Sequence, residues 1–368
     1  MSELQVNTAP KKKKVWLEIV RVLAVFLVIF NHTGDYGFHY WATLAGGYRY
    51  WLFMGCAVMT VMNIPLFYLI SGVTLMGKEE TVGTVWKKRV LRYALVILIF
   101  TFVQYLWLSI NAEDGFRESF SAWEWFVTML SENIIVPYWF LYEYLGFLVM
   151  LPLLRRMIRN LKEQEFHYLF LLYLVFTGAL PIIEYILTKW HTILNVSFNV
   201  AYMTGDLIVF PALGYYVSKK PKPTWQQLAV LWAMTLLCVV YTCLMTEYKL
   251  MYIHQLSEAR VGTFFKMLIA IPAVTVFLTI RKLFDTDDGK GITLHPGVEK
   301  LFLSMGSCVF GIYLVEQIFR DLFYDCGLFL VDHLPNFPAA IIYCICVFLA
   351  AYLFVALLKL IPGVNKLI

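Results

Sequence analysis

The chain has 368 residues, of which 60% are apolar and only 15% are charged, and its formal net charge is +5. Soluble domains carry about 25% charged residues, so this composition excludes an ordinary soluble protein and indicates a polytopic membrane protein. We attribute the surplus of basic residues to membrane topology and do not expect a nucleic-acid-binding protein.

The first predicted element is a polar, basic tail at residues 1–14, which ends in the run Lys11–Lys14. Residues 15–368 are predicted to form a single membrane domain. The apolar segment after the tail carries Glu18 and Arg21 and ends without a small-residue cleavage site. We therefore do not expect a cleaved signal peptide.

The apolar stretches after the tail predict about ten membrane-spanning helices. A helix satisfies its backbone hydrogen bonds internally, as lipid requires, and each stretch has roughly the length that the hydrocarbon core demands. The predicted spans are 15–34, 51–76, 90–110, 136–154, 167–187, 198–217, 226–246, 262–280, 300–320 and 338–361. The predicted fold class is an all-α polytopic integral membrane protein.

Basic residues are distributed unevenly between the two sides of these spans. With a cytoplasmic N-terminus, 22 of the 30 Lys and Arg residues fall in inner segments and seven in outer segments, and the remaining one is Arg21. Cytoplasmic segments of membrane proteins are enriched in Lys and Arg. The sequence therefore predicts that both termini lie on the cytoplasmic side.

The first span contains Arg21 and His32, which are eleven positions apart. On a helix the two side chains would share a face about 16 Å apart along the axis. Ionisable residues inside a span are expensive and mark candidate functional sites. Each also has a structural interpretation. His32 could be an interfacial histidine bound to a backbone carbonyl, and Arg21 could snorkel or pair with Glu18 one turn earlier.

Several carboxylates are predicted to lie in the outer half of the membrane near His32. Glu316 is expected at nearly the same depth, and Glu143 and Asp206 at about 10–12 Å below the outer face. Asp35, three positions after His32, is expected to share its helix face. A carboxylate that holds the imidazole in one tautomer would make His32 a competent general base.

A second basic pair, Arg89 and Arg92, begins the third span and follows Lys87 and Lys88. These residues could simply anchor the helix at the inner surface. Alternatively, two guanidinium groups one turn apart could hold a phosphorylated ligand. CoA would suit such a clamp, because its pantetheine arm of about 15–20 Å is comparable to the rise between Arg21 and His32.

Three further features complete the survey of the chain. Residues 111–135 interleave acidic and aromatic side chains, which predicts an amphipathic element along the outer interface. The loop Asp285–Lys290 shows turn chemistry and no predicted role. The seven cysteines form neither a C-x-x-C motif nor a Cys/His cluster, so we expect no disulfide framework and no metal site.

Five stretches resemble, in order, the motifs of one family of membrane enzymes. They are the Arg-x10-His pattern of residues 16–32, the run Asn63–Gly72 (similar to PLFFxxSG), Arg89-x-x-Arg92, the WFL segment 138–146 and the segment 306–314 (similar to SxxIYLxH). In this pattern the chain resembles the membrane acyltransferase family 3. Its layout, without an appended extracellular esterase-like domain, is similar to the stand-alone type, such as the O-acetyltransferase of enterobacterial common antigen.

The resemblance implies transfer of an acyl group, usually acetyl, from cytoplasmic acyl-CoA to a hydroxyl group of a glycan or lipid-linked sugar of the cell envelope. It implies a catalytic role for His32 and donor-binding roles for Arg21, Arg89 and Arg92. Acetyl-CoA or another acyl-CoA would be the donor substrate, without a metal.

The chain departs from the family pattern at Glu316, where many members have a histidine. This carboxylate is a natural candidate to orient His32, with Asp35, Glu143 and Asp206 as possible supporting residues. A salt bridge between Glu316 and Arg320, one turn further along the helix, is an equally good interpretation.

We therefore expect a multi-pass O-acyltransferase of a bacterial cytoplasmic membrane, with His32 acting as a base or carrying the acyl group transiently. A transporter or flippase for an envelope precursor is the alternative. The ordered motifs and the absence of a convincing internal repeat speak against it. A membrane sensor is a third possibility, but the sequence contains no soluble output domain.

Overall fold

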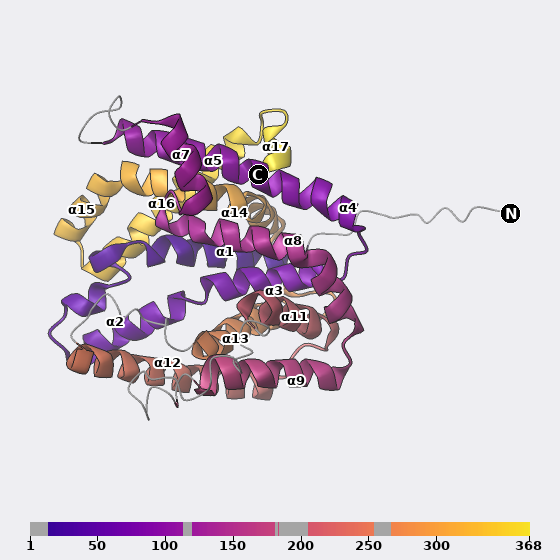
Figure 1. The fold of residues 1–368 in the computed structure, drawn as a ribbon. Coiled ribbons are helices and arrows are strands. Elements are labelled where there is room, and N and C mark those ends of the chain that lie inside the picture. The colour runs from indigo at the N-terminus through magenta and orange to yellow at the C-terminus, as the bar shows by residue number, and fades with distance from the viewer. Residues whose placement is uncertain (1–13, 113–119, 181–182, 184–204, 254–265) are drawn as a thin grey trace.

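The computed structural model describes residues 14–112, 120–180, 183, 205–253 and 266–368, and every regular element in this part of the chain is helical (Figure 1). The α-helices are α1 (Val15–Asn31), α2 (Gly47–Thr60), α3 (Asn63–Leu75), α4 (Val82–Val85), α5 (Leu91–Ile110), α7 (Ala122–Ser131), α8 (Trp139–Asn160), α9 (Glu163–Tyr173), α11 (Asp206–Lys219), α12 (Trp225–Ile253), α13 (Lys266–Phe284), α14 (Pro296–Leu322), α15 (Tyr324–His333), α16 (Asn336–Leu358) and α17 (Val364–Leu367). Shorter turns are η1 (Gly34–Tyr36), η2 (Tyr40–Thr43), η3 (Trp86–Val90), η4 (Val136–Tyr138) and η5 (Leu174–Ala179).

Six helical stretches within the described residues are long and apolar enough to cross a membrane. They are Gly47–Leu75, Val82–Ile110, Val136–Asn160, Trp225–Tyr248, Pro296–Leu322 and Asn336–Leu358. Each overlaps one predicted span. The count of ten spans and the orientation of the termini stay predictions, and parts of the predicted spans 167–187, 198–217 and 262–280 lie outside the described residues, as does the tail 1–14 except Lys14.

Helix α1 lies in the interior of the bundle, packed against α14, α3, α16 and α13 (Figure 1). None of its residues is exposed, and Val20, Ala24 and Val25 are completely buried. Near its start, the ring of Trp16 packs edge-on against Phe277, with ring centroids 5.2 Å apart. A predominantly apolar helix without an exposed residue belongs in such a core. Arg21 on this helix and His32 just after it, the two ionisable residues predicted to be functional, are therefore packed against other parts of the protein.

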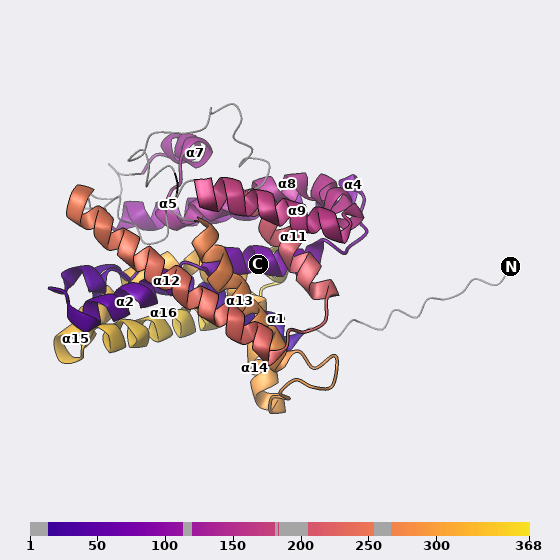
Figure 2. The same ribbon diagram turned by 90° about the horizontal axis from the view of Figure 1, so that it is seen from below.

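The other helices surround α1 in two groups. In Figure 1, α5, α7 and α8 lie above α1, and α12 and α13 lie below it; in Figure 2, seen from below, α12 and α13 face the viewer. The predicted amphipathic segment 111–135 contains the short helix α7, whose Trp123 is largely exposed; residues 113–119 of that segment lie outside the described part.

Helices α3 and α11 pack with their backbones in contact. A Cβ atom placed on Gly72 would lie 2.2 Å from the carbonyl oxygen of Pro211, and one on Gly214 would lie 2.1 Å from that of Leu69. Small residues permit this close approach between membrane helices, where packing provides much of the association energy. The glycine that ends the run Asn63–Gly72 is therefore required by the packing of α3.

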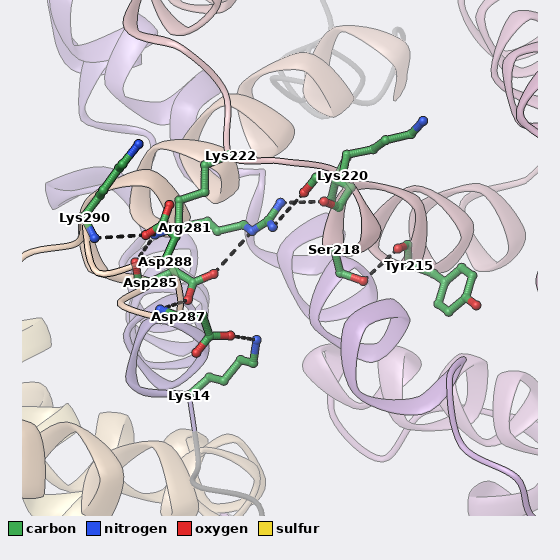
Figure 3. A network of polar contacts seen from close by, with 11 residues as sticks. Lys14, Tyr215, Ser218, Lys220, Lys222, Arg281, Asp285, Asp287, Asp288 and Lys290 are labelled. Atoms are coloured by element: carbon green, nitrogen blue, oxygen red, sulfur yellow. Dashed lines mark hydrogen bonds and ion pairs between the residues drawn. The ribbon is translucent and has the colours of Figure 1, made fainter.

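The loop Asp285–Lys290 links three chain segments at one end of the bundle (Figure 3). Asp287 pairs with Lys14 at the start of α1, at 2.5 Å. Asp288 pairs with Lys222, which follows α11, at 2.5 Å. Turn chemistry alone gave this loop no predicted role, because its partners are distant in sequence.

Candidate functional site

A cavity of about 330 Å³ lies between α1, α3, α5, α8 and α14. Basic side chains line one end of it, here called the basic end: Arg21, Lys88, Arg89 and Arg92. Aromatic side chains line the other, here called the aromatic end: Phe67, Phe140 and Tyr313. Along α3 the cavity runs from Leu75 to Phe67, eight positions or about 12 Å. The structure thus brings all three arginines predicted to bind a donor to one cavity.

Arg89 and Arg92 are each held through the same edge of their own guanidinium group, the edge formed by Nε and Nη2. Nε and Nη2 of Arg89 donate to the carboxylate of Glu80 at 2.9 and 2.8 Å. Nε and Nη2 of Arg92 donate to the backbone carbonyl of Leu367 at 3.2 and 3.1 Å. These bonds do not use Nη1 of either residue. An arginine fixed in this way keeps donors for a second acceptor, because its fork carries five N–H groups.

Arg21 forms an ion pair with Glu18 one turn earlier, as the structural interpretation of Arg21 expected. The same side chain also lines the cavity. Gly306 of α14 makes room for this pair, since a Cβ at that position would lie 2.2 Å from Oε2 of Glu18. The ion pair thus holds Arg21 at the basic end of the cavity.

Midway along the cavity, Ser71 and Tyr144 form a polar pair in a largely apolar wall. The hydroxyl group of Ser71 donates to the carbonyl oxygen of Phe67 at 2.9 Å, and its oxygen lies 3.0 Å from the hydroxyl oxygen of Tyr144. Because the Ser71 proton is already used, Tyr144 is the donor between the two hydroxyl groups. The phenolic oxygen of Tyr144 therefore retains lone pairs that can accept an N–H group.

His32 follows the last residue of α1, and its ring faces Glu316 of α14. Nδ1 of His32 lies 3.3 Å from Oε1 of Glu316; both atoms are buried, and neither has a hydrogen-bond partner elsewhere in the described part of the chain. Glu316 is completely buried, whereas the His32 side chain is 25% exposed. The buried edge of the imidazole thus faces the carboxylate, and the exposure comes from the rest of the ring.

Arg320 contacts both members of this pair. Its Nε donates to Oε2 of Glu316 at 2.6 Å, and its Nη1 donates to the backbone carbonyl of His32 at 3.2 Å. The two interpretations of Glu316, as a partner of His32 and as a partner of Arg320, therefore hold together. The guanidinium group balances the buried carboxylate, which would be costly without a partner.

The contact with Glu316 favours one form of the imidazole. An ionised carboxylate can only accept hydrogen bonds, so a neutral ring placed against it carries its proton on Nδ1. Nε2 then has the free lone pair that a general base needs.

The expectation that Asp35 shares the helix face of His32 is wrong. Helix α1 ends at Asn31, and Gly34 takes a positive φ of 61° that ends any helical continuation. Asp35 is therefore exposed in the turn η1.

The other two candidate carboxylates lie on different helices. Glu143 lies half-buried on α8, next to Tyr144. Asp206 lies in the first turn of α11 and accepts a hydrogen bond from Tyr173 at 3.0 Å. Glu316 is thus the candidate whose contact with His32 the structure defines.

Two buried tyrosines, of which Tyr313 lines the cavity, lie on chain segments close to Glu316. Tyr138 donates to the carbonyl oxygen of Leu314 at 2.7 Å, and Tyr313 donates to that of Pro137. This reciprocal pair of bonds joins η4 to α14, one turn before Glu316. Tyr313 lines the cavity, and His32 is not among its described lining residues. We call Tyr138 and Tyr313 the tyrosine pair.

Comparison with known families decides what kind of protein carries this site. Residues 14–356 match the model of the acyltransferase domain family, acyltransferase 3. The chain belongs to this family. The match runs from the start of α1 into α16 and includes every residue of the site discussed so far except Leu367. No curated protein and no solved structure matches the chain. The likeness to one stand-alone O-acetyltransferase accordingly stays a prediction.

The structure of this acyltransferase adds site residues that sequence reasoning missed. Glu80, Ser71, Tyr144, Tyr138 and Tyr313 are the additions. Glu80 carried a usable signal, because it is one of two acidic residues in a strongly basic segment. The four hydroxyl-bearing residues lie within the motif segments 63–72, 138–146 and 306–314, but the motifs did not indicate which of their side chains enter the site; the packing selects these.

Proposed function

We propose that the chain is an integral-membrane O-acyltransferase that moves an acyl group, most often acetyl, from acyl-CoA to a hydroxyl group of an envelope glycan or lipid-linked sugar. The observation that carries this proposal is the single cavity that Arg21, Arg89 and Arg92 share. Membership of the acyltransferase family supports the type of reaction.

The cavity suits the chemistry of an acyl-CoA donor. Lys88 and the free Nη1 groups of Arg89 and Arg92 would bind phosphate oxygens at the basic end. The pantetheine arm would run toward the aromatic end, where Tyr144 can accept one of its amide N–H groups. The thioester would then lie near Tyr313, three positions before Glu316 on α14.

In the proposed reaction, Nε2 of His32 takes the proton of the acceptor hydroxyl group as its oxygen attacks the thioester carbonyl. A carbon–oxygen bond forms, the carbon–sulfur bond breaks, and the thiolate of CoA receives the proton from the imidazolium. For direct transfer the thioester must reach His32, which is not among the described lining residues of the cavity, and we propose that Tyr138 and Tyr313 move to admit it.

The decisive experiment measures transfer of radiolabelled acetyl groups from acetyl-CoA by membranes that contain the full chain. His32→Ala is expected to abolish transfer while expression is unchanged, because it removes the base. His167→Ala is the matched control, since His167 lies exposed on α9 beside Tyr216. Full activity of the His32 variant would contradict the proposed mechanism.

A second measurement separates the enzyme from the alternative of a transporter or flippase. Purified enzyme is expected to form an acylated product only when acyl-CoA is supplied, whereas a carrier changes only the location of its substrate. Mass spectrometry of envelope glycans from cells with and without the gene would identify the acceptor through a difference of one acyl group.

A further inference from the structure

Glu80 lies between α3 and α4, and its carboxylate contacts arginines from two different helical segments. Arg89, which lines the cavity, binds it through Nε and Nη2 at 2.9 and 2.8 Å. Nη2 of Arg155 on α8 lies 2.8 Å from Oε2 of the same carboxylate. The Glu80 side chain is only 18% exposed. It is therefore an inward-facing counter-ion at the basic end of the cavity.

Arg155 fixes Glu80 to the body of the protein. It is 3% exposed and donates from Nε to the carbonyl oxygen of Leu75 at 2.8 Å, and Leu75 lines the cavity. The Glu80 carboxylate is thus fixed by the buried Arg155, and it in turn fixes the cavity-lining Arg89. Such side-on, two-bond arginine–carboxylate contacts fix the plane of the guanidinium group as well as its position.

We infer that Glu80 is a positioning residue of the donor site, which orients Arg89 so that its Nη1 edge meets a phosphate group of acyl-CoA. The inference rests on the proposed function. A long arginine side chain has many rotamers, and holding it beforehand removes the entropic cost that binding would otherwise carry.

The charge balance of the basic end supports this role. Lys78 lies close enough that burial, together with the neighbouring Arg89, lowers its pKa. Hydrogen bonds from Arg89 and then Arg155 lower the pKa of Glu80 to about 2, so the carboxylate stays ionised at neutral pH. Glu80 and Glu18 are fewer than the cations around them, so the two carboxylates let the cluster form and still leave it positive overall, as a phosphate site requires.

The chain offers a matched control at the neighbouring position. Glu79 pairs with Arg159, one turn after Arg155 on α8, at 2.6 Å. Its side chain is 79% exposed, and Arg159 is not among the described residues that line the cavity. A Glu79→Gln substitution therefore removes the same charge and a similar ion pair without touching Arg89.

The experiment measures equilibrium binding of acetyl-CoA and of S-acetyl-pantetheine, which lacks the phosphate groups, to the full chain purified in detergent. Glu80→Gln is expected to weaken acetyl-CoA binding about tenfold, because a charge-assisted contact loses its orientation. Binding of acetyl-pantetheine is expected to be unchanged, and Glu79→Gln should match the wild type with both ligands. In turnover assays, KM for acetyl-CoA should rise while kcat stays constant.

The outcomes separate the two proposals. If the wild type binds no acetyl-CoA, the proposed function fails. If the wild type binds it and Glu80→Gln binds it equally well, or if that variant loses acetyl-pantetheine binding to the same degree, the positioning role is overturned. Should Glu80→Gln fail to fold, Glu80→Asp retains the charge, and it must show the same selective loss for acetyl-CoA, because the shorter side chain cannot hold both nitrogens of Arg89.

Discussion

At the buried edge of the His32 ring, individual neighbouring residues each fix a different part of the proposed base. Glu316 faces Nδ1, and Arg320 binds both the carboxylate and the backbone of His32. The proposed base thus has its ring orientation and its main-chain position set by neighbours on one helix, α14. Positioned general bases contribute about 10²–10⁴-fold to enzymatic rates, so loss of orientation should be visible in kcat.

We predict that Glu316→Gln lowers kcat for acyl transfer about 10²-fold, because the amide no longer selects the tautomer that leaves Nε2 unprotonated. Initial rates with saturating acetyl-CoA would measure this. Asp35→Asn is the control, since Asp35 is exposed in η1, and it should retain wild-type kcat. Equal loss in both variants would mean that Glu316 does not act through His32.

We predict that Tyr144→Phe raises KM for acyl-CoA about fivefold with little change in kcat, because one hydrogen-bond acceptor for the pantetheine arm is removed. Tyr142→Phe provides the comparison, as its hydroxyl group donates to the carbonyl oxygen of Met129 and it is not among the described cavity-lining residues. Steady-state kinetics with varied acetyl-CoA would distinguish them. An unchanged KM in Tyr144→Phe would remove this residue from the donor site.

At the scale of helices, the contact between α3 and α11 limits what α3 can tolerate. Gly72→Val is expected to destabilise the protein strongly, by about 3 kcal/mol or more, because a side chain would overlap the backbone at Pro211. Thermal unfolding in detergent would measure the loss. Gly146→Ala should be nearly neutral, since no atom lies within 4 Å of a Cβ placed there. Comparable stability of the two variants would contradict the packing argument.

The segment between α3 and α4 should respond to acid through Glu80. Its pKa falls from an ordinary 4.5 to about 2 in the folded protein, mainly because Arg89 donates to it. A lowered pKa stabilises the fold at pH values above 4.5, and this contribution is lost as the pH falls from 4.5 to about 2. We therefore predict that wild-type stability declines over this window more steeply than that of Glu80→Gln. Parallel melting curves at several pH values would show a constant difference if the prediction is wrong.

Hydropathy was sufficient to locate most helices but not to identify the residues at which they end. The first span was predicted to reach Gly34, whereas α1 ends at Asn31, because the positive φ of Gly34 and the turn η1 belong to the loop. The span predicted from 51 to 76 is divided near Val61 into α2 and α3. Apolar composition is continuous across such breaks, so a hydropathy pattern cannot register them.

The candidate site was accessible from sequence only in part. Arg21 could be selected because charged residues are rare in membrane spans, and Arg89 and Arg92 because they match the Arg-x-x-Arg motif of the family; the structure brings all three to one cavity. The contact of Glu316 with His32 followed from matching depths. Depth along a helix can be counted from sequence, but the lateral arrangement of helices cannot, and Glu80 and Tyr144 depend on it.

For the whole molecule, the uneven distribution of basic residues predicts which surface faces the cytoplasm. In a cysteine-free variant, Tyr48→Cys, an exposed position before the predicted span 51–76, should react with a membrane-impermeant maleimide in intact cells. Thr81→Cys, an exposed position on the opposite side, should react only after permeabilisation. The reverse labelling pattern would overturn the orientation with both termini inside.

The reciprocal bonds of Tyr138 and Tyr313 have a consequence for the cell's energy supply. Under the proposed function, a donor from one compartment and a sugar acceptor in the other require a route through the protein, and an open route would leak protons down their electrochemical gradient. While their hydroxyl groups stay bonded to the backbone, the two tyrosines would keep that route closed between turnovers. Such an enzyme could transfer acyl groups across a membrane that carries a proton gradient without dissipating that gradient.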